Sequence, residues 1–136
     1  MKRFEFIEHT ADTGLVAYGD TLAEAFANAA YGMFSIIADL KDVKEIESRR
    51  VMVSETDMEG LLFSWLNDLI YLFDVEAILF NRFEIAEFTE GRMEAVCHGE
   101  KYDASRHRLK TEVKSATYHM LEVDKKKNTV RVIFDI

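Results

Sequence analysis

The feature of this sequence that most constrains its fold is an apolar stripe within residues 57–73. Large apolar side chains recur there every three or four residues, which is the spacing of one face of an α-helix: Met58, Leu61, Leu62, Trp65, Leu66, Leu69, Leu72 and Phe73. Thr56 and Glu59 have the spacing of a capping box, in which each side chain accepts a hydrogen bond from an otherwise unpaired backbone N–H. We therefore predict a helix over residues 57–73 whose apolar stripe is buried.

A second amphipathic segment lies nearer the N-terminus, in residues 22–38. Its apolar positions also follow the helical period: Leu22, Ala25, Phe26, Ala29, Met33, Ile36 and Ile37. Thr21 and Glu24 form another pair with capping-box spacing at the start of this segment. The pattern predicts a helix over residues 22–38 that is buried along the same stripe.

The remaining apolar runs are short and typical of strands. They predict strands at residues 4–8, 15–18, 51–53, 78–88, 92–98, 116–124 and 129–135, with hairpin turns at residues 89–91 and 125–128. Residues 41–50 are expected to be an exposed charged run, and residues 99–114 to be polar and irregular. The chain has no proline and no linker-like stretch. We predict a single α+β domain over residues 1–136, with two amphipathic helices packed on a mostly antiparallel β-sheet.

Charge and motif content exclude several classes of function. The chain has 17 Lys and Arg residues against 25 Asp and Glu residues, a net charge of −8. It therefore lacks the basic footprint of a stand-alone nucleic-acid binder. The sequence contains no GxGxxG or GxxxxGKS/T loop that would cradle nucleotide phosphates, no GxSxG elbow and no HExxH zinc motif. No nucleotide cofactor is expected on this chain.

Cysteine and histidine usage adds no catalytic signal. The single cysteine, Cys97, rules out an internal disulfide and any CxxC site, and its alternating strand context predicts a buried, inert thiol. His9, His98, His107 and His119 lack zinc-finger spacing, so we expect them at the surface or in hydrogen bonds. No apolar run reaches about 18 residues and the first residues lack a signal-peptide core. We expect a cytoplasmic protein with no membrane partner.

Two places could carry chemistry, the turn around Asp12 and the C-terminal residues. Residues 132–136 are apolar apart from Asp135, although chain ends are usually frayed and polar. A strand that ends there fixes the Asp135 carboxylate beside the terminal carboxylate, and such neighbouring anions repel unless a cation or donor neutralises them. Oxygen ligands of this kind suit Ca²⁺ or Mg²⁺ rather than zinc. The alternative is that Asp12 caps a turn and Asp135 is solvated.

A set of short motifs, in order along the whole chain, resembles the archease family. The motifs are His9-Thr10-Ala11-Asp12, Thr21-Leu22-x-Glu24, Leu61-Leu62-x-x-Trp65-Leu66, Gly99-Glu100-x-x-Asp103-x-x-x-His107, Lys114-Ser115-Ala116-Thr117-Tyr118-His119 and Phe134-Asp135-Ile136. Singly each motif is weak, and the ordered set with its Asp-Ile end is specific. One departure is Ser115, where the family pattern has alanine, which is a small-for-small change.

The resemblance implies a small α+β protein that is not itself an enzyme and assists the RNA-splicing ligase RtcB in tRNA splicing. In that system the ligase binds GTP and manganese and becomes guanylylated, and the archease-like partner promotes guanylylation and multiple turnover. Contact with tRNA is then only indirect, through the ligase. The resemblance also implies a divalent-ion site, usually assigned to Ca²⁺. Its ligands here would be Asp12, Asp135 and Ile136, the last through a main-chain or terminal oxygen.

Two other hypotheses remain open from the sequence. One is a chaperone or modulator of an RNA-modifying enzyme such as a tRNA methyltransferase, a role also suggested for archease-like proteins. The other is a small metal-dependent hydrolase that uses Asp12 and Asp135. The hydrolase is the weakest of the three, because no general base such as a paired His and Glu is evident beside the proposed metal.

Overall fold

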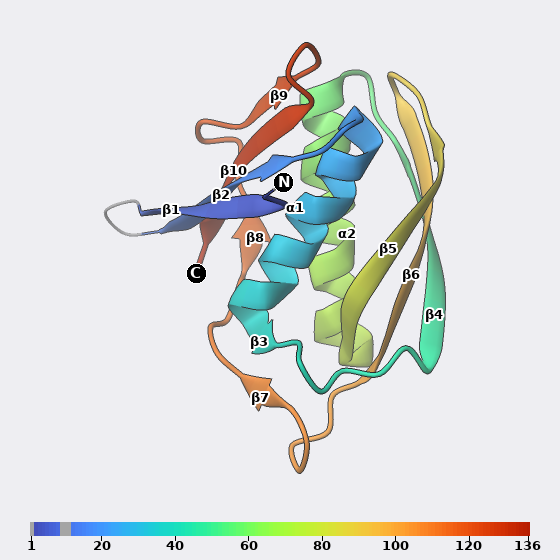
Figure 1. Ribbon diagram of the computed structural model, residues 1–136, viewed down its shortest axis with the longest axis vertical. Helices are drawn as coiled ribbons and strands as arrows, with labels where there is room; N and C mark the ends of the chain where they lie inside the picture. The colour runs from blue at the N-terminus through green and yellow to red at the C-terminus, as the bar shows by residue number, and fades with distance from the viewer. Residues whose placement is uncertain (1, 9–11) are drawn as a thin grey trace.

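The computed structural model describes residues 2–8 and 12–136. Its elements follow the order β1 (Phe4–Glu8), β2 (Thr13–Tyr18), α1 (Leu22–Ile37), β3 (Ala38–Asp39), β4 (Glu47–Ser54), α2 (Met58–Glu76), β5 (Ile78–Phe88), β6 (Arg92–Lys101), β7 (Arg108–Leu109), β8 (Ser115–Ala116), β9 (Glu122–Asp124) and β10 (Thr129–Asp135). The predicted α+β class, with two helices and antiparallel strands, is confirmed (Figure 1).

The strands form two main sheets rather than the one sheet we predicted. A five-stranded sheet has the order β1-β2-β10-β8, with β9 also paired to β10, and a three-stranded sheet has the order β4-β6-β5. The short strands β3 and β7 form a separate pair. The two helices lie between the two main sheets (Figure 1), and α1 contacts both β2 and β5. Burial on both sides explains why apolar and small residues cover so much of this helix.

Both helices begin close to the predicted residues. The Thr21 hydroxyl caps α1 by accepting a hydrogen bond from the backbone N–H of Glu24 at 3.1 Å. The cap of α2 is Asp57 rather than the predicted Thr56, because the Asp57 carboxylate accepts from the Gly60 N–H at 2.7 Å. An Asp side chain reaches the first free N–H groups as well as Thr does. Helix α2 also continues to Glu76, three residues beyond the predicted end at residue 73.

Two predicted strands have different boundaries in the structure. The strand predicted at residues 51–53 is β4, which begins at Glu47, so the prediction of an exposed charged run over residues 41–50 is wrong for residues 47–50. The alternating pattern is hidden because two half-buried positions, Glu47 and Arg49, carry charged side chains. The strand predicted over residues 116–124 is broken into β8 and β9. Met120 lies between them with φ of 56°, in the left-handed region that a strand does not use.

The segment predicted to be irregular, residues 99–114, is partly ordered by pairing. Strand β6 continues through it to Lys101, and β7 pairs with β3. Gly99 is required at its position in β6, since an added Cβ would overlap the backbone carbonyl of Leu79 in β5. A close approach of two strands needs a residue without a side chain.

Trp65 lies at the centre of the core that α1, α2 and the two sheets share. Its side chain is fully buried, and its indole N–H donates a hydrogen bond to the backbone carbonyl of Phe26 in α1 at 3.0 Å. A buried indole needs such a partner for its one polar group. Cys97 is also fully buried, and burial raises the pKa of its thiol to about 12. The prediction of an inert thiol at Cys97 is confirmed.

Within the described residues, no helix is both long enough and apolar enough to cross a membrane.

Candidate metal site at the C-terminal edge

The candidate site is built on β10, which is an inner strand of the five-stranded sheet. Its antiparallel register with β2 runs from Thr129 opposite Tyr18 to Phe134 opposite Thr13. Asp12 and Asp135 are the chain neighbours of this last pair, Thr13 and Phe134. Two of the three predicted metal ligands therefore lie at the same end of the sheet, near the C-terminus marked in Figure 1.

The alternation of β10 decides which face these carboxylates occupy. Val132 and Phe134 are fully buried toward the helices, so Ile133 and Asp135 belong to the opposite face. The side chain of Ile133 covers Gly14, where an added Cβ would lie 2.5 Å from the Ile133 methyl carbon. Asp135 follows immediately beyond this apolar contact and is exposed. The site is therefore an exposed carboxylate edge at the end of a closely packed strand pair.

The backbone around Asp135 is fixed from its other side by β8. Asp135 pairs with Ser115, and the Lys114 N–H donates to the Asp135 carbonyl at 2.8 Å. Thr117 donates both its N–H, at 3.0 Å, and its hydroxyl, at 2.8 Å, to the carbonyl of Ile133.

Helix α2 holds β8 in place through one side chain. The Asn67 amide accepts from the Ala116 N–H at 2.9 Å and donates to the Ala116 carbonyl at 3.3 Å. The Asn67 side chain thus pairs with Ala116 as a neighbouring strand would. Sequence analysis missed this support, although residues 114–119 stand out as a motif. The C-terminal edge is rigid because a helix and two strands all fix its backbone.

The three predicted ligands are all oxygen donors. Among the described residues, no three side chains of His, Cys, Asp or Glu gather in a metal-binding group. The predicted set is of another kind, since it uses two carboxylates, Asp12 and Asp135, with a main-chain oxygen of Ile136. Calcium sites accept carboxylate, main-chain and water oxygens together. The residues fit a hard divalent cation, and their role as ligands stays a prediction. His9, Thr10 and Ala11, from the same predicted turn, lie outside the described residues.

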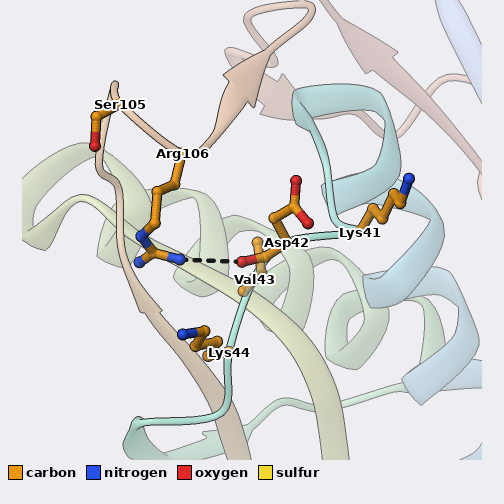
Figure 2. Close-up of a pocket in the computed structure, with 6 residues that line it drawn as sticks. All are labelled: Lys41, Asp42, Val43, Lys44, Ser105 and Arg106. Atoms are coloured by element: carbon orange, nitrogen blue, oxygen red, sulfur yellow. Dashed lines mark hydrogen bonds between the residues drawn. The ribbon is translucent and has the colours of Figure 1, made fainter.

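A second polar cluster surrounds Glu100 at the opposite end of the helices from β9. The buried Glu100 carboxylate accepts hydrogen bonds from the Arg106 guanidinium and from the backbone N–H of Lys44. Arg106 is the main reason that the pKa of Glu100 lies below its usual value. Arg106 also donates to the Asp42 carbonyl at 3.3 Å, as Figure 2 shows. The cluster joins the 41–44 loop to the 103–107 loop.

This cluster borders a cavity of about 500 Å³, which is lined by Lys41, Asp42, Val43, Lys44, Ser105 and Arg106 (Figure 2). Three cationic side chains would suit an anion, but Arg106 is already held by Glu100 and by Asp103, whose carboxylate lies 3.6 Å from its Nε. The carboxylate of Asp42 also lines the cavity. These contacts favour a structural role for the cavity wall over an anion site.

His107 and His98 lie in polar contacts, as predicted. His107 is buried, and its Nδ1 accepts the Asp103 N–H at 2.9 Å, so the ring proton lies on Nε2. That nitrogen lies 3.5 Å from the Glu100 carboxylate. His98 pairs with Glu84 on the three-stranded sheet. The residues of the Gly99–His107 motif therefore have a structural role, because their contacts hold the 103–107 loop in place.

Comparison with known proteins identifies the family. The sequence matches the Archease protein family over residues 4–136. The chain belongs to the archease family. It is 41% identical over 128 residues to Protein archease from Methanosarcina mazei, covering 91% of this chain and 88% of the relative. It is 42% identical over 135 residues to Protein archease from one strain of Saccharolobus islandicus, covering 98% and 97%.

Two solved structures share the fold. The solution structure of Protein 1598 from Methanobacterium thermoautotrophicum is 38% identical, with a TM-score of 0.81 and complete coverage of both chains, 100% each. A crystal structure of an archease, described as a possible chaperone, from Thermotoga maritima is 21% identical, with a TM-score of 0.63. It covers 96% of this chain and 94% of its own. The second likeness shows the archease fold alone.

Proposed function

We propose that this protein activates an RNA-splicing ligase of the RtcB type in tRNA exon joining. Support comes from membership of the archease family over nearly the whole chain. The sequence has no phosphate-cradling loop of its own, which suits an accessory protein better than a ligase. In this proposal the ligase binds GTP, manganese and tRNA in the cytoplasm, and this chain promotes guanylylation and repeated turnover.

The observation that carries the proposal is that the β2–β10 register ends at Thr13 and Phe134, the chain neighbours of Asp12 and Asp135. We assign Asp12, Asp135 and a main-chain oxygen of Ile136 as the ligands of Ca²⁺, with Mg²⁺ as the second choice. When bound, the cation would supply positive charge beside the exposed Asp135 carboxylate. The chain's own part is to hold these oxygens still, because β8 and β2 fix the backbone on both sides.

Reconstitution with the cognate ligase tests the proposal. This chain alone should ligate no RNA and bind no GTP. Added to the ligase in equimolar amount, it should raise the guanylylated fraction and convert single turnover to multiple turnover. Unchanged ligation kinetics would overturn the activator proposal.

Variants of the carboxylate edge separate activity from folding in this assay. Asp12→Asn and Asp135→Asn should lose most of the stimulation while their circular dichroism spectra stay those of the folded protein. Asp20→Asn is a matched control, because Asp20 is an exposed carboxylate just beyond the other end of β2. Full stimulation by both edge variants would show that these carboxylates are not part of the activating site.

The second candidate function is a chaperone or modulator of an RNA-modifying enzyme such as a tRNA methyltransferase. The observation that favours it is the description of the Thermotoga maritima archease as a possible chaperone. The same reconstitution distinguishes the two functions. An archease that leaves the ligase unchanged but suppresses aggregation of the methyltransferase, or changes its product pattern, would support this second function.

A further inference from the structure

The outward side of α2 exposes large apolar side chains that the fold does not cover. Tyr71 and Val75, one helical turn apart, are 64% and 61% exposed. Met52 of β4 is 56% exposed and lines a shallow pocket together with Tyr71. Single exposed apolar residues are ordinary, whereas a contiguous group of them marks an interaction site.

A second group, a partly exposed aromatic pair, lies two turns earlier on α2, beside the segment after β8. Tyr118 is 61% exposed, and its ring stacks on Phe63 of α2 with centroids 4.1 Å apart and planes 13° apart. Asn67 lies on α2 between Phe63 and Tyr71 and holds Ala116, two residues before Tyr118. We call the residues Met52, Phe63, Tyr71, Val75 and Tyr118 the α2 surface.

The charge of α2 is of one sign. Its residues include Glu59, Asp68, Asp74 and Glu76, with Asp57 as the cap, and no Lys, Arg or His. Asp74 lies in the last turns, where the helix dipole makes a negative charge unfavourable. Among the described residues Asp74 has no ion pair, whereas Glu76 is held by Arg49 at 2.9 Å. The carboxylate of Asp74 lies in a pocket that Lys110 also lines, without an ion pair in the described residues.

The neighbourhood of Asp68 shows the same excess of negative charge. The pKa of the Asp68 carboxyl lies above its usual value, because surrounding groups displace water and because Glu55 adds negative charge. Arg50, which lines the pocket beside Tyr71, is paired with Glu94 of the neighbouring strand. The α2 surface is therefore an apolar patch bordered by the carboxylates of Asp68 and Asp74, while the cations beside it, Arg49 and Arg50, are already paired with Glu76 and Glu94.

We infer that the α2 surface is the docking site for a basic protein surface, one with apolar residues at its centre and Lys or Arg at its border. Exposed tyrosines at the centre of a patch are typical interface residues, and opposite charges at the border steer association. A second copy of this chain would place two acidic borders against each other, and RNA would bring phosphates against them. Both alternatives are disfavoured by charge.

This surface is connected to the carboxylate edge through β8. The backbone that donates to the Asp135 carbonyl belongs to Lys114, and Tyr118 lies only four residues further along. A partner seated on Tyr118 therefore contacts the segment that follows β8, the strand that pairs with Asp135. The inference rests on the proposed function in taking an RNA ligase, a protein that must handle a polyanion, as the basic partner.

The test measures binding of the cognate ligase directly and through its stimulation. Tyr71→Ser and Tyr118→Ser should each raise the dissociation constant about tenfold, as loss of a central interface side chain does. Maximal stimulation at saturating protein and the thermal response to Ca²⁺ should not change. Ile46→Ser is the matched control, because Ile46 is 69% exposed outside this surface. Asp74→Asn should weaken the salt dependence of binding.

Each outcome has one meaning. If the wild-type protein stimulates the ligase and both tyrosine variants bind as tightly as the wild type, the docking site is wrong and the proposed function stands. If the wild type neither binds nor stimulates the ligase, the proposed function fails and this inference fails with it. A wild-type dimer that Tyr71→Ser converts to monomer would assign the surface to a second copy. If RNA displaces the ligase from the wild-type protein, and Tyr71→Ser or Tyr118→Ser weakens RNA binding, the surface would be assigned to nucleic acid.

Discussion

The three-stranded sheet and the C-terminal edge of the five-stranded sheet both carry charged residues, but they arrange them differently. On the three-stranded sheet, Arg82 lies 2.9 Å from Glu84, and Arg92 lies 3.0 Å from Glu87. At the C-terminal edge, Asp135 has no ion pair among the described residues. The first region neutralises its charges internally, whereas the second presents an anion.

The two arrangements have different physical consequences. The pKa of Glu84 is lowered by His98 and Arg82, so its charge is stabilised by its own neighbours. Exposed pairs of this kind contribute little to stability. Because their charges cancel, they also produce little electrostatic potential that could attract a ligand. An exposed carboxylate without a counter-ion, fixed on a rigid backbone, keeps its affinity for an external cation. Charge alone therefore does not identify a site, and the distribution of counter-charges does.

The largest expected effect comes from a core substitution that unfolds the three-stranded sheet and the C-terminal edge together. Trp65→Ala deletes the fully buried indole between the sheets and its hydrogen bond to Phe26. Loss of such a side chain costs about 3–5 kcal/mol. We expect a matching fall in the urea midpoint, with ligase stimulation and Ca²⁺ response lost in proportion to unfolding. A variant that stays as stable as the wild type would contradict the shared core.

The next effect tests the C-terminal edge alone. For protein stripped of metal, Ca²⁺ should raise the free energy of unfolding by about 2.7 kcal/mol when its free concentration is 100 times the dissociation constant. Asp135→Asn should abolish this increment without lowering stability in chelator, because the side chain lies outside the core. Asp20→Asn should keep the increment. Identical melting curves in chelator and in millimolar Ca²⁺ would exclude the metal site.

Lengthening the chain beyond Ile136 sharpens the same test. If a terminal carboxylate takes part, an added Gly-Ser should remove most of the Ca²⁺ increment, since it converts a charged ligand to a neutral carbonyl. If only the main-chain carbonyl of Ile136 takes part, the loss should be small. Thermal melts with and without Ca²⁺ distinguish these outcomes, and the metal-free melting temperature serves as the control.

A smaller effect concerns Glu100, a buried carboxylate whose counter-ion is already present. Its pKa is lowered in the folded state, chiefly by Arg106, so its contribution to stability is present above the unfolded value near ~4.3 and is lost as pH falls through the folded value. Glu100→Gln should therefore flatten the acid limb of stability against pH. The exposed Glu112→Gln variant is the control, and an unchanged acid limb in Glu100→Gln would contradict this pairing.

The helices could be predicted from sequence because their signals are local. A period near 3.6 and a capping residue lie within each segment, so the start of α1 after Thr21 followed directly. The end of α2 could not be predicted in the same way. Ala77 ends the helix in a left-handed conformation, with φ of 56°, and the sequence has no glycine or proline there to indicate it. The two-sheet arrangement also escaped prediction, because which strands pair is decided by contacts far apart in the chain.

The candidate site shows the same division. Asp12 and Asp135 could be chosen from residue type and position, but they lie over a hundred residues apart in the chain. Only the β2–β10 register shows that their neighbours Thr13 and Phe134 are paired. The supports from Asn67 and Thr117 depend on the break between β8 and β9. That break was missed because residues 116–124 look like one continuous strand.

The smallest expected effect returns to the three-stranded sheet. Arg50 pairs with Glu94 across β4 and β6, with side chains 62% and 19% exposed. Replacing both by glutamine should change the free energy of unfolding by no more than about 0.5 kcal/mol, because water replaces most of what the pair provides. Each single variant should also stay within this range, and the Ca²⁺ increment should equal that of the wild type. A double-mutant cycle in urea measures the coupling energy between Arg50 and Glu94. A coupling above about 1.5 kcal/mol would mean that this ion pair stabilises the three-stranded sheet and would contradict the prediction.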